Sequence, residues 1–215
     1  NETDLKNLLN FAIKQISPVL RGYRNHISVN KSVFIPDSLS NLCSLVLGAM
    51  KSSAFLTGFD LSHRMFYMDQ VEFASCSELK IISMPVLADK TDYLLTDGPI
   101  IYNSMLTRSK LHSHRLYLLY DGFSTYIFVG NNIPHEIMIS VFCAEEMYQV
   151  VDIVPQDNEM SRKIFSLLSK SIKLCVENGV GMQTFLNKLN YDRTMNLPSY
   201  QEFLTKLQKE IIQGS

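Results

Sequence analysis

The chain has 215 residues, of which 46% are hydrophobic and 19% are charged. This composition supplies enough apolar material for one or two packed cores and argues against an intrinsically disordered chain. Twenty lysines and arginines stand against 21 acidic residues, so the formal net charge of -1 creates no uniform field that favours nucleic acid or anionic lipid. The longest apolar runs fall short of the roughly 20 residues that cross a bilayer, and no transmembrane segment is expected.

The four cysteines, at positions 43, 76, 143 and 175, form no Cys-x-x-Cys pair. A zinc or redox motif is therefore not indicated, and we expect reduced thiols in the core of a cytosolic protein. The chain starts at Asn1, and its first ten residues carry charges where a signal peptide has its apolar stretch. We expect the chain to be a fragment of a longer protein.

The first part of the chain has the apolar periodicity of helices. Apolar residues recur every three or four positions over 4–23, which predicts an amphipathic helix that Pro18 bends or restarts. A second helix is predicted to open at Pro36-Asp37-Ser38 and to run through Met50 before Gly58 interrupts the pattern. A third covers 61–73, with its methionines in the core. Residues 1–79 therefore form a predicted helical unit.

The pattern changes after Leu79. The run 81–87 is short and rich in β-branched residues, so a strand is predicted to begin there. Residues 89–114 contain Asp97-Gly98-Pro99 and many polar side chains, which predicts a long connection with a short strand near 100–102.

The clearest local signal is a β-hairpin. Residues 116–120 and 123–130 are apolar arms on either side of Asp121-Gly122, a pair that favours the two positive-φ positions of a tight turn. Both faces of each arm are apolar. We therefore place the hairpin in the middle of a sheet that helices cover on both sides.

The rest of the chain alternates short apolar segments. A helix is predicted from Pro134, a strand at 150–154, and a long helix from Ser161 that Gly179 ends. Residues 185–191 fit a strand or a short helix. A final helix from Pro198 would carry an inward-facing apolar stripe, consisting of Phe203, Leu204, Leu207, Ile211 and Ile212.

A search for catalytic, cofactor or metal-binding residues is negative. His112 and His114 form an i, i+2 pair without the further ligands of a metal site, and they fit a solvated loop better. Asp89, Asp92 and Asp97 lack the glycine and terminal glutamate of a calcium-binding EF-hand loop.

Two further polar motifs also have structural interpretations. Asn178-Gly179-Val180-Gly181 lacks the third glycine of a dinucleotide-binding fingerprint and is predicted to end a helix rather than follow a strand. Glu145-Glu146 fits the exposed end of a helix. We therefore assign no catalytic, cofactor-binding or metal-binding residue.

Several short motifs occur in an order that resembles the COPII inner-coat cargo adaptor, the Sec24 family. They are Tyr23-Arg24-Asn25-His26, Ile35-Pro36-Asp37, the helix end at 49–52, the run from Tyr117-Leu118-Leu119 to Phe128-Val129-Gly130, and Ser199-Tyr200-x-x-Phe203-Leu204. The order covers nearly the whole chain. Phe128 stands where the family usually has tryptophan, and 79–87 shares only Pro85 with the family's aromatic-Pro-Arg-Leu run.

The resemblance implies an α+β fold in the C-terminal part of that subunit. A helical domain at 1–79 would precede a gelsolin-like domain at 80–215, which has a central mixed β-sheet sandwiched between helices and includes a C-terminal helix. The trunk, zinc finger and β-sandwich of the family would lie outside this chain. No cofactor is therefore expected in it, and no cargo-binding residue is carried over.

The resemblance also implies a function in vesicle traffic. The protein would be a non-catalytic, cytoplasmic coat component, peripheral on endoplasmic reticulum exit sites and COPII vesicles, that selects cargo for transport to the Golgi. Its implied partners are the Sec23 coat subunit, outer-coat proteins, cargo sorting signals and, indirectly, the Sar GTPase. A gelsolin-type actin-binding module is the alternative, and an enzyme completed by residues outside this chain is a weaker third hypothesis.

Overall fold

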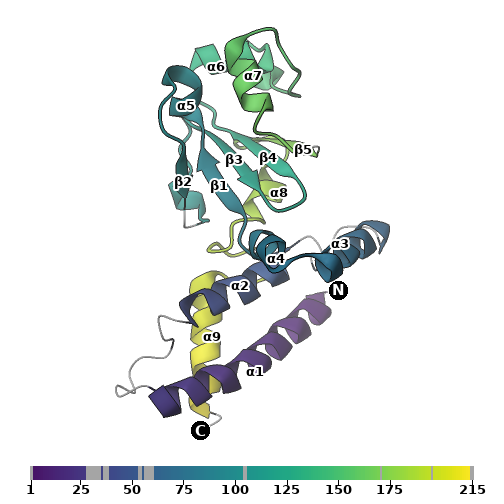
Figure 1. The fold of residues 1–215 in the computed structure, drawn as a ribbon, viewed down its shortest axis with the longest axis vertical. Coiled ribbons are helices and arrows are strands. Elements are labelled where there is room, and N and C mark those ends of the chain that lie inside the picture. Colours follow the sequence, from purple (N-terminus) through teal and green to yellow (C-terminus); the bar gives the residue numbers. More distant parts are fainter. Residues whose placement is uncertain are drawn as a thin grey trace. The chain divides into compact units, whose positions relative to one another are not determined.

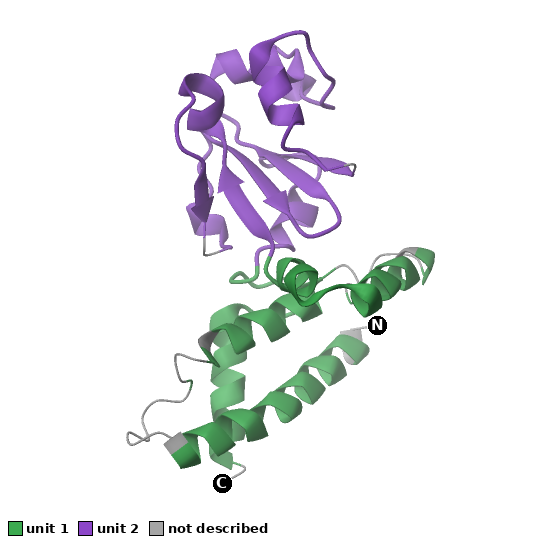
Figure 2. Ribbon diagram, in the orientation of Figure 1, with its two compact units in different colours: residues 1–84, 190–215 green, residues 85–189 purple. Residues whose placement is uncertain are grey.

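The computed structural model describes residues 2–27, 35, 39–52, 55, 61–103, 106–169, 171–194 and 196–213. The chain divides into two compact units, coloured separately in Figure 2. Unit 1 comprises residues 1–84 and 190–215, and unit 2 comprises residues 85–189. Each unit has its own hydrophobic core, and each is described by itself below.

Unit 1 is helical. It contains α1 (Glu2–Ile27), α2 (Ser40–Lys51), α3 (Leu61–Phe73), α4 (Cys76–Ser83) and α9 (Tyr200–Gln213). The last helix, which begins at Tyr200, lies against α1 and α2, although these two helices end at Ile27 and Lys51 (Figure 1). The main buried residues of this core are Leu9, Ile13, Ile16, Leu20, Cys43, Leu47, Met50, Phe203, Leu207 and Ile211.

The three helices predicted in the first 79 residues are confirmed. Pro18 does not restart the first one, because α1 is a single helix from Glu2 to Ile27 whose apolar stripe is buried on both sides of Pro18, at Ile16 and Leu20. The predicted helix start at 36–38 and the break at Gly58 lie outside the described residues.

The strand predicted from residue 81 is wrong, because residues 81–83 end α4. This helix is fixed at its start by a capping box. The Ser75 amide donates to Glu78 Oε2 at 2.7 Å, and the Glu78 amide donates to Ser75 Oγ at 3.3 Å. These reciprocal bonds satisfy two donors that a helix start otherwise leaves unpaired, and the first strand begins only after Pro85.

Unit 2 is built on a five-stranded mixed sheet. Its strands are β1 (Val86–Asp89), β2 (Ile101–Asn103), β3 (Leu116–Tyr120), β4 (Thr125–Val129) and β5 (Ile172–Val176). They lie in the order β2-β1-β3-β4-β5, with antiparallel pairs up to β4 and a parallel β4–β5 pair. The helices and this sheet confirm the predicted α+β class, and β2 confirms the predicted short strand near 100–102.

The hairpin is confirmed at the centre of the sheet, but its turn is not the predicted one. Tyr120 pairs with Thr125, so the loop has four residues rather than two. Within this loop Gly122 has a positive φ of 89°, whereas Asp121 does not. The Asp121 carboxylate closes the loop, because its Oδ1 accepts the amides of Phe123 at 3.1 Å and Ser124 at 2.9 Å.

Helices cover both faces of the hairpin, as predicted (Figure 1). On one face, Leu116 and Ile127 pack with apolar residues of α5 (Thr91–Thr96), α6 (His135–Phe142) and α7 (Glu159–Phe165). On the other face, the Phe128 ring lies 5.1 Å from that of Phe185 in α8 (Met182–Leu186). Alternate residues of each strand therefore enter two different apolar layers.

The predicted long helix from Ser161 to Gly179 is wrong. Its first turns form α7, which ends at Phe165, and its second half forms β5 beside β4. The apolar residues of 172–176 are compatible with both a helix and a buried strand. The segment forms a strand because it pairs with β4. Gly179 therefore follows a strand rather than ending a helix.

Three other predictions are resolved in unit 2. The predicted helix from Pro134 is α6, and the short-helix alternative near residue 185 is α8. The strand predicted at 150–154 is wrong, since this described segment has no ladder partner and runs as irregular backbone. The connection 89–114 contains α5, which the sequence pattern did not predict.

The final helix forms as predicted, but it belongs to the compact unit of the N-terminal helices. Residues 190–215 lie in unit 1 because Phe203, Leu207 and Ile211 are fully buried in its core. Ile212 was predicted to face inward, yet it is 54% exposed. The division into domains at 1–79 and 80–215 stays a prediction.

Candidate functional site

Asp89, Asp92 and Asp97, which were considered as calcium ligands, form ion pairs with basic side chains of the protein. Arg115 Nη1 lies 2.6 Å from Asp92 Oδ1, and Arg115 Nε lies 3.7 Å from Asp89 Oδ2. Asp97 Oδ1 lies 2.5 Å from Lys163 Nζ. These contacts attach α5 to its surroundings in unit 2. Across the described residues, no three His, Cys, Asp or Glu side chains come together in a way that could hold a metal ion.

The remaining polar motifs also have structural surroundings. The rings of His112 and His114 stack with centroids 5.7 Å apart in the loop before β3. Residues 178–181 follow β5 and precede α8, so their predicted place after a helix is wrong. The motif still lacks the third glycine of a dinucleotide fingerprint. Glu145 and Glu146 precede a 3-10 turn at Met147–Gln149, where the side chain of Gln149 accepts both of their amides.

The four cysteines fall into two classes. Cys43 and Cys175 are buried, and burial raises the pKa of their thiols to about 11 and about 12. Cys76 and Cys143 are exposed, so the prediction of core thiols is wrong for these two. All four are free of disulfide bonds.

A buried ion pair lies under the hairpin loop of unit 2. Lys188 Nζ is 2.7 Å from Asp121 Oδ2, and both side chains are almost fully buried. Burial alone would raise the pKa of Asp121, but the Lys188 ammonium and the two loop amides hold it below its usual value. The pair thus links the loop to the segment after α8, and we interpret it as structural.

A second buried lysine ties together segments of unit 1. Lys51, at the end of α2, donates to the carbonyl of Asn190 at 2.9 Å and to that of Asp192 at 2.6 Å. The Asn190 amide in turn donates to the carbonyl of Ser83 at 2.7 Å. Burial lowers the pKa of Lys51 to about 8, an effect that the nearby Asp192 and Glu202 partly offset. This network joins α2, the end of α4 and the segment before α9.

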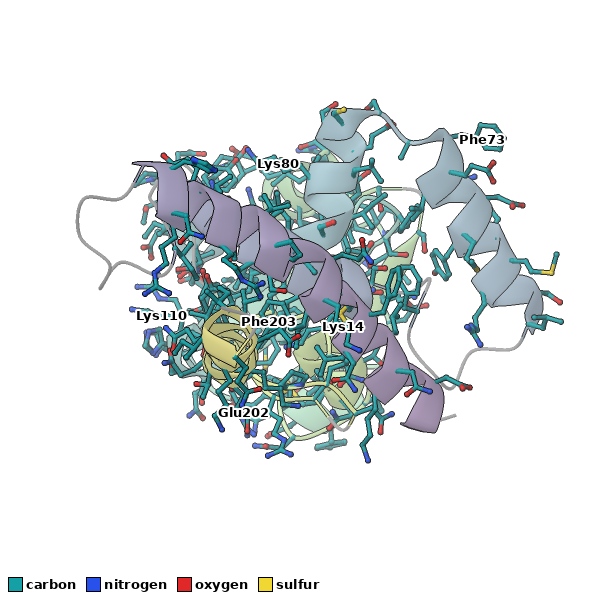
Figure 3. All side chains as sticks on the ribbon, turned by 90° about the horizontal axis from the view of Figure 1, so that it is seen from below. Lys14, Phe73, Lys80, Lys110, Glu202 and Phe203 are labelled. Carbon is teal, nitrogen blue, oxygen red and sulfur yellow. The ribbon has the colours of Figure 1, made fainter. Side chains whose placement is uncertain are left out.

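One feature of the described surface that fits an interaction with another protein is α3. Five of its thirteen residues are large apolar side chains between 49% and 83% exposed; they are Leu61, Met65, Phe66, Met68 and Phe73. Phe73 projects outward from the end of the helix (Figure 3). The prediction that Met65 and Met68 fill a core is therefore wrong. A concentration of exposed apolar side chains is typical of contact surfaces.

Sequence pattern could not identify this surface. The apolar residues of α3 are distributed around the helix instead of forming one stripe, and Tyr67 is the member that enters the interior. The spacing of the other apolar residues of α3 therefore does not show which side of the helix is buried. Among the helices of the described residues, none has both the length and the apolar character needed to cross a bilayer.

Comparison with known proteins finds a family model and several relatives that match parts of the chain. Residues 1–81, which contain α1, α2, α3 and most of α4, match the family model of the Sec23/Sec24 helical domain. The chain is 22% identical over 200 residues to protein transport protein SEC24 C of Arabidopsis thaliana, a match that covers 86% of the chain and 18% of the relative.

Two further relatives match the chain with similar identity and coverage. Protein transport protein SEC24 of Dictyostelium discoideum is 25% identical over 207 residues, covering 85% of the chain and 20% of the relative. Protein transport protein Sec24A of Mus musculus is 24% identical over 218 residues, covering 89% of the chain and 20% of the relative. The chain thus spans about a fifth of the length of these relatives.

The fold also has a counterpart among solved structures. The crystal structure of the human COPII-coat protein Sec24c superposes with a TM-score of 0.79 at 19% identity, covering 99% of this chain and 32% of that one. The match confirms the fold over both units. Residues 1–81 therefore match the Sec23/Sec24 helical domain, and the chain is similar to part of the length of Sec24 proteins.

Proposed function

We propose that the chain is the C-terminal part of a COPII cargo-adaptor subunit, with a helical domain at 1–79 and a gelsolin-like domain at 80–215. In this proposal the protein pairs with a Sec23 partner and selects cargo for transport from the endoplasmic reticulum to the Golgi. The observation that carries it is the helical-domain match over residues 1–81, together with Sec24 relatives that cover 85% to 89% of the chain.

The role proposed for this part of the subunit is structural rather than catalytic. Asp121, Lys188 and Lys51 are buried charged groups, and each is engaged in a contact that holds segments of its own unit together. The exposed apolar side chains of α3 suit assembly with other protein surfaces. We further propose a cytoplasmic location, peripheral on endoplasmic reticulum exit sites.

Affinity purification from the cells that express this protein tests the assignment. A tag is placed on the endogenous gene, and the proteins that copurify are identified and quantified by mass spectrometry. The proposal predicts a Sec23-family protein in near-equal molar amount and fluorescence of the tagged protein at exit sites. Purification without any Sec23-family protein would contradict it.

Actin co-sedimentation separates this function from the gelsolin-type alternative. The purified chain is centrifuged with filamentous actin, with and without calcium, beside a gelsolin domain as the positive control. The coat proposal predicts that the chain stays in the supernatant in both conditions. Calcium-dependent sedimentation with actin would support the alternative instead.

A further inference from the structure

A cavity of about 400 Å³ opens on one face of the unit 2 sheet. Its floor contains alternate residues of β1 and β3, since Val86 lies opposite Tyr120 and Ala88 lies opposite Leu118. Residues 166–169, which follow α7, form another wall. Alternate residues of neighbouring strands face the same side of a sheet, so the strand register builds this floor directly.

Lys90 lies in the wall of this cavity, directly after β1. Lys90 is only 5% exposed, and no carboxylate of the described residues lies within ion-pair distance of its ammonium group. The ammonium lies 5.6 Å from the centre of the Tyr102 ring, which also lines the cavity and is 65% exposed. Burial lowers the pKa of Lys90.

Two other buried lysines among the described residues show how unusual this arrangement is. Lys188 has the Asp121 carboxylate at 2.7 Å, and Lys51 has two backbone carbonyls within 2.9 Å. A buried cation is normally paired with an anion or satisfied by hydrogen bonds. Lys90 has an aromatic face and an open cavity instead.

Three hydroxyl groups around the cavity are already used as donors. Thr125 Oγ1 donates to Ser169 Oγ, Ser169 Oγ donates to the carbonyl of Ser171, and Ser166 Oγ donates to the carbonyl of Lys163. The remaining lining is largely hydrocarbon, with Val86, Ala88, Leu118, Leu167 and Leu168. The cavity therefore offers one positive charge beside an apolar floor.

We propose that this cavity binds a peptide through the carboxylate of one acidic side chain, which pairs with the Lys90 ammonium while a neighbouring aliphatic side chain lies on the apolar floor. A single cation suits a monovalent carboxylate better than a phosphate dianion, which requires several charged donors. The volume is near the lower limit of ligand pockets and holds one acidic residue and one aliphatic neighbour.

The partly exposed positions at the rim suit a peptide rather than an enclosed small acid. Val86 is 39% exposed and Tyr120 is 38% exposed, so the cavity opens to solvent beside the strands. A chain can leave the cavity there in an extended conformation. This inference goes beyond the proposed function and does not depend on it, because it follows from the cavity alone.

NMR titration of the full chain tests the proposal. Three acetylated and amidated probe peptides are used, with central sequences Leu-Glu-Leu, Leu-Asp-Leu and Val-Glu-Val between two serines on each side. Matched peptides carry Gln or Asn in place of the acid. We expect at least one acidic peptide to shift resonances of the cavity residues, with affinity at least tenfold above that of its amide counterpart.

Two lysine variants provide the internal control. Lys90→Met keeps the length of the side chain and removes its charge, and it should weaken binding at least tenfold while the spectrum outside the cavity stays unchanged. Lys110→Met removes an exposed charge in the same unit and should leave binding unaltered. Equal binding of acid and amide peptides, equal loss in both variants, or no binding of any probe at 5 mM would overturn the proposal.

Discussion

At the scale of single residues, Gly48 shows how closely α2 approaches α4. A Cβ atom at this position would lie 1.6 Å from the carbonyl oxygen of Ser83 and 2.6 Å from the Asn190 amide nitrogen. The first neighbour is backbone, so it cannot move aside as the end of a side chain would. Glycine is therefore required here by space rather than by backbone conformation.

Gly48→Ala should lower the free energy of unfolding by about 2 kcal/mol or more, because the added methyl group separates the two helices. Gly22→Ala is the matched control on α1, where nothing lies within 4 Å of the new Cβ. This control should gain about 0.5 to 1 kcal/mol, since alanine favours a helix over glycine. Urea denaturation measures both, and equal stability of the two variants would mean that α2 and α4 do not touch.

Lys51 makes the stability of the protein depend on pH. Its pKa is about 8 in the folded chain, against an ordinary value of 10.5, so the unfolded chain binds more protons between these two values. The free energy of unfolding therefore rises with pH over that range. Below about pH 8, the buried ammonium reduces stability.

The change should be visible in a comparison with Lys51→Met, which cannot titrate at this position. Between pH 8 and pH 9, the protein should gain about 1 kcal/mol of stability relative to this variant. Chemical denaturation at the two pH values gives the difference, and the variant cancels the contributions of the other titrating groups. A difference that does not change with pH would show that the ammonium is hydrated in the folded state.

At the scale of elements, the hairpin of β3 and β4 is the part that sequence predicts best. Its arms are apolar on both faces, and a helix covers each face. The Phe128 ring is 1% exposed and lies 5.1 Å from the Phe185 ring and 6.0 Å from the Tyr117 ring. Its contacts come from two different elements.

Phe128→Ala should cost about 3 to 5 kcal/mol, because it leaves a cavity between the sheet and α8. Ile101→Ala, on the half-exposed edge strand β2, should cost less than about 1 kcal/mol. Both values come from guanidinium denaturation monitored by circular dichroism. A cost below about 1 kcal/mol for Phe128→Ala would place the hairpin at a solvated surface.

Where the sequence pattern of a segment gave the wrong structure, the deciding interaction lay outside that segment. Residues 172–176 have a helical spacing of apolar positions, but parallel pairing with β4 makes them a strand. Residues 81–83 have β-branched character, but the capping box at Ser75 extends a helix through them. The Lys90 cavity could not be predicted at all, because its floor comes from strands whose register is set by pairing.

At the scale of the whole molecule, the chain returns to its first unit after completing the second. The core of unit 1 needs Leu197, Phe203, Leu207 and Ile211 from the last 26 residues, whereas the core of unit 2 lies within 85–189. Local patterns predicted the final helix but carried no information about which unit it completes. The burial of its apolar residues in the core of unit 1 shows that α9 completes this unit.

Fragments of the chain test this division. Residues 85–189 should fold alone and unfold cooperatively, whereas residues 1–84 alone should not, because α1 and α2 then expose the face that α9 covers. Addition of the peptide 190–215 should restore helical circular dichroism to 1–84. Cooperative unfolding of 1–84 without the peptide would contradict the division.

Membrane recruitment tests the central proposal, that this protein is a COPII coat component, most directly. Endoplasmic reticulum microsomes are incubated with the tagged protein, purified together with its copurifying partners, and with Sar GTPase locked in its GTP-bound or GDP-bound form. The account predicts that the protein floats with the membranes only when Sar is GTP-bound. Equal recovery on the membranes with both forms of Sar would contradict it.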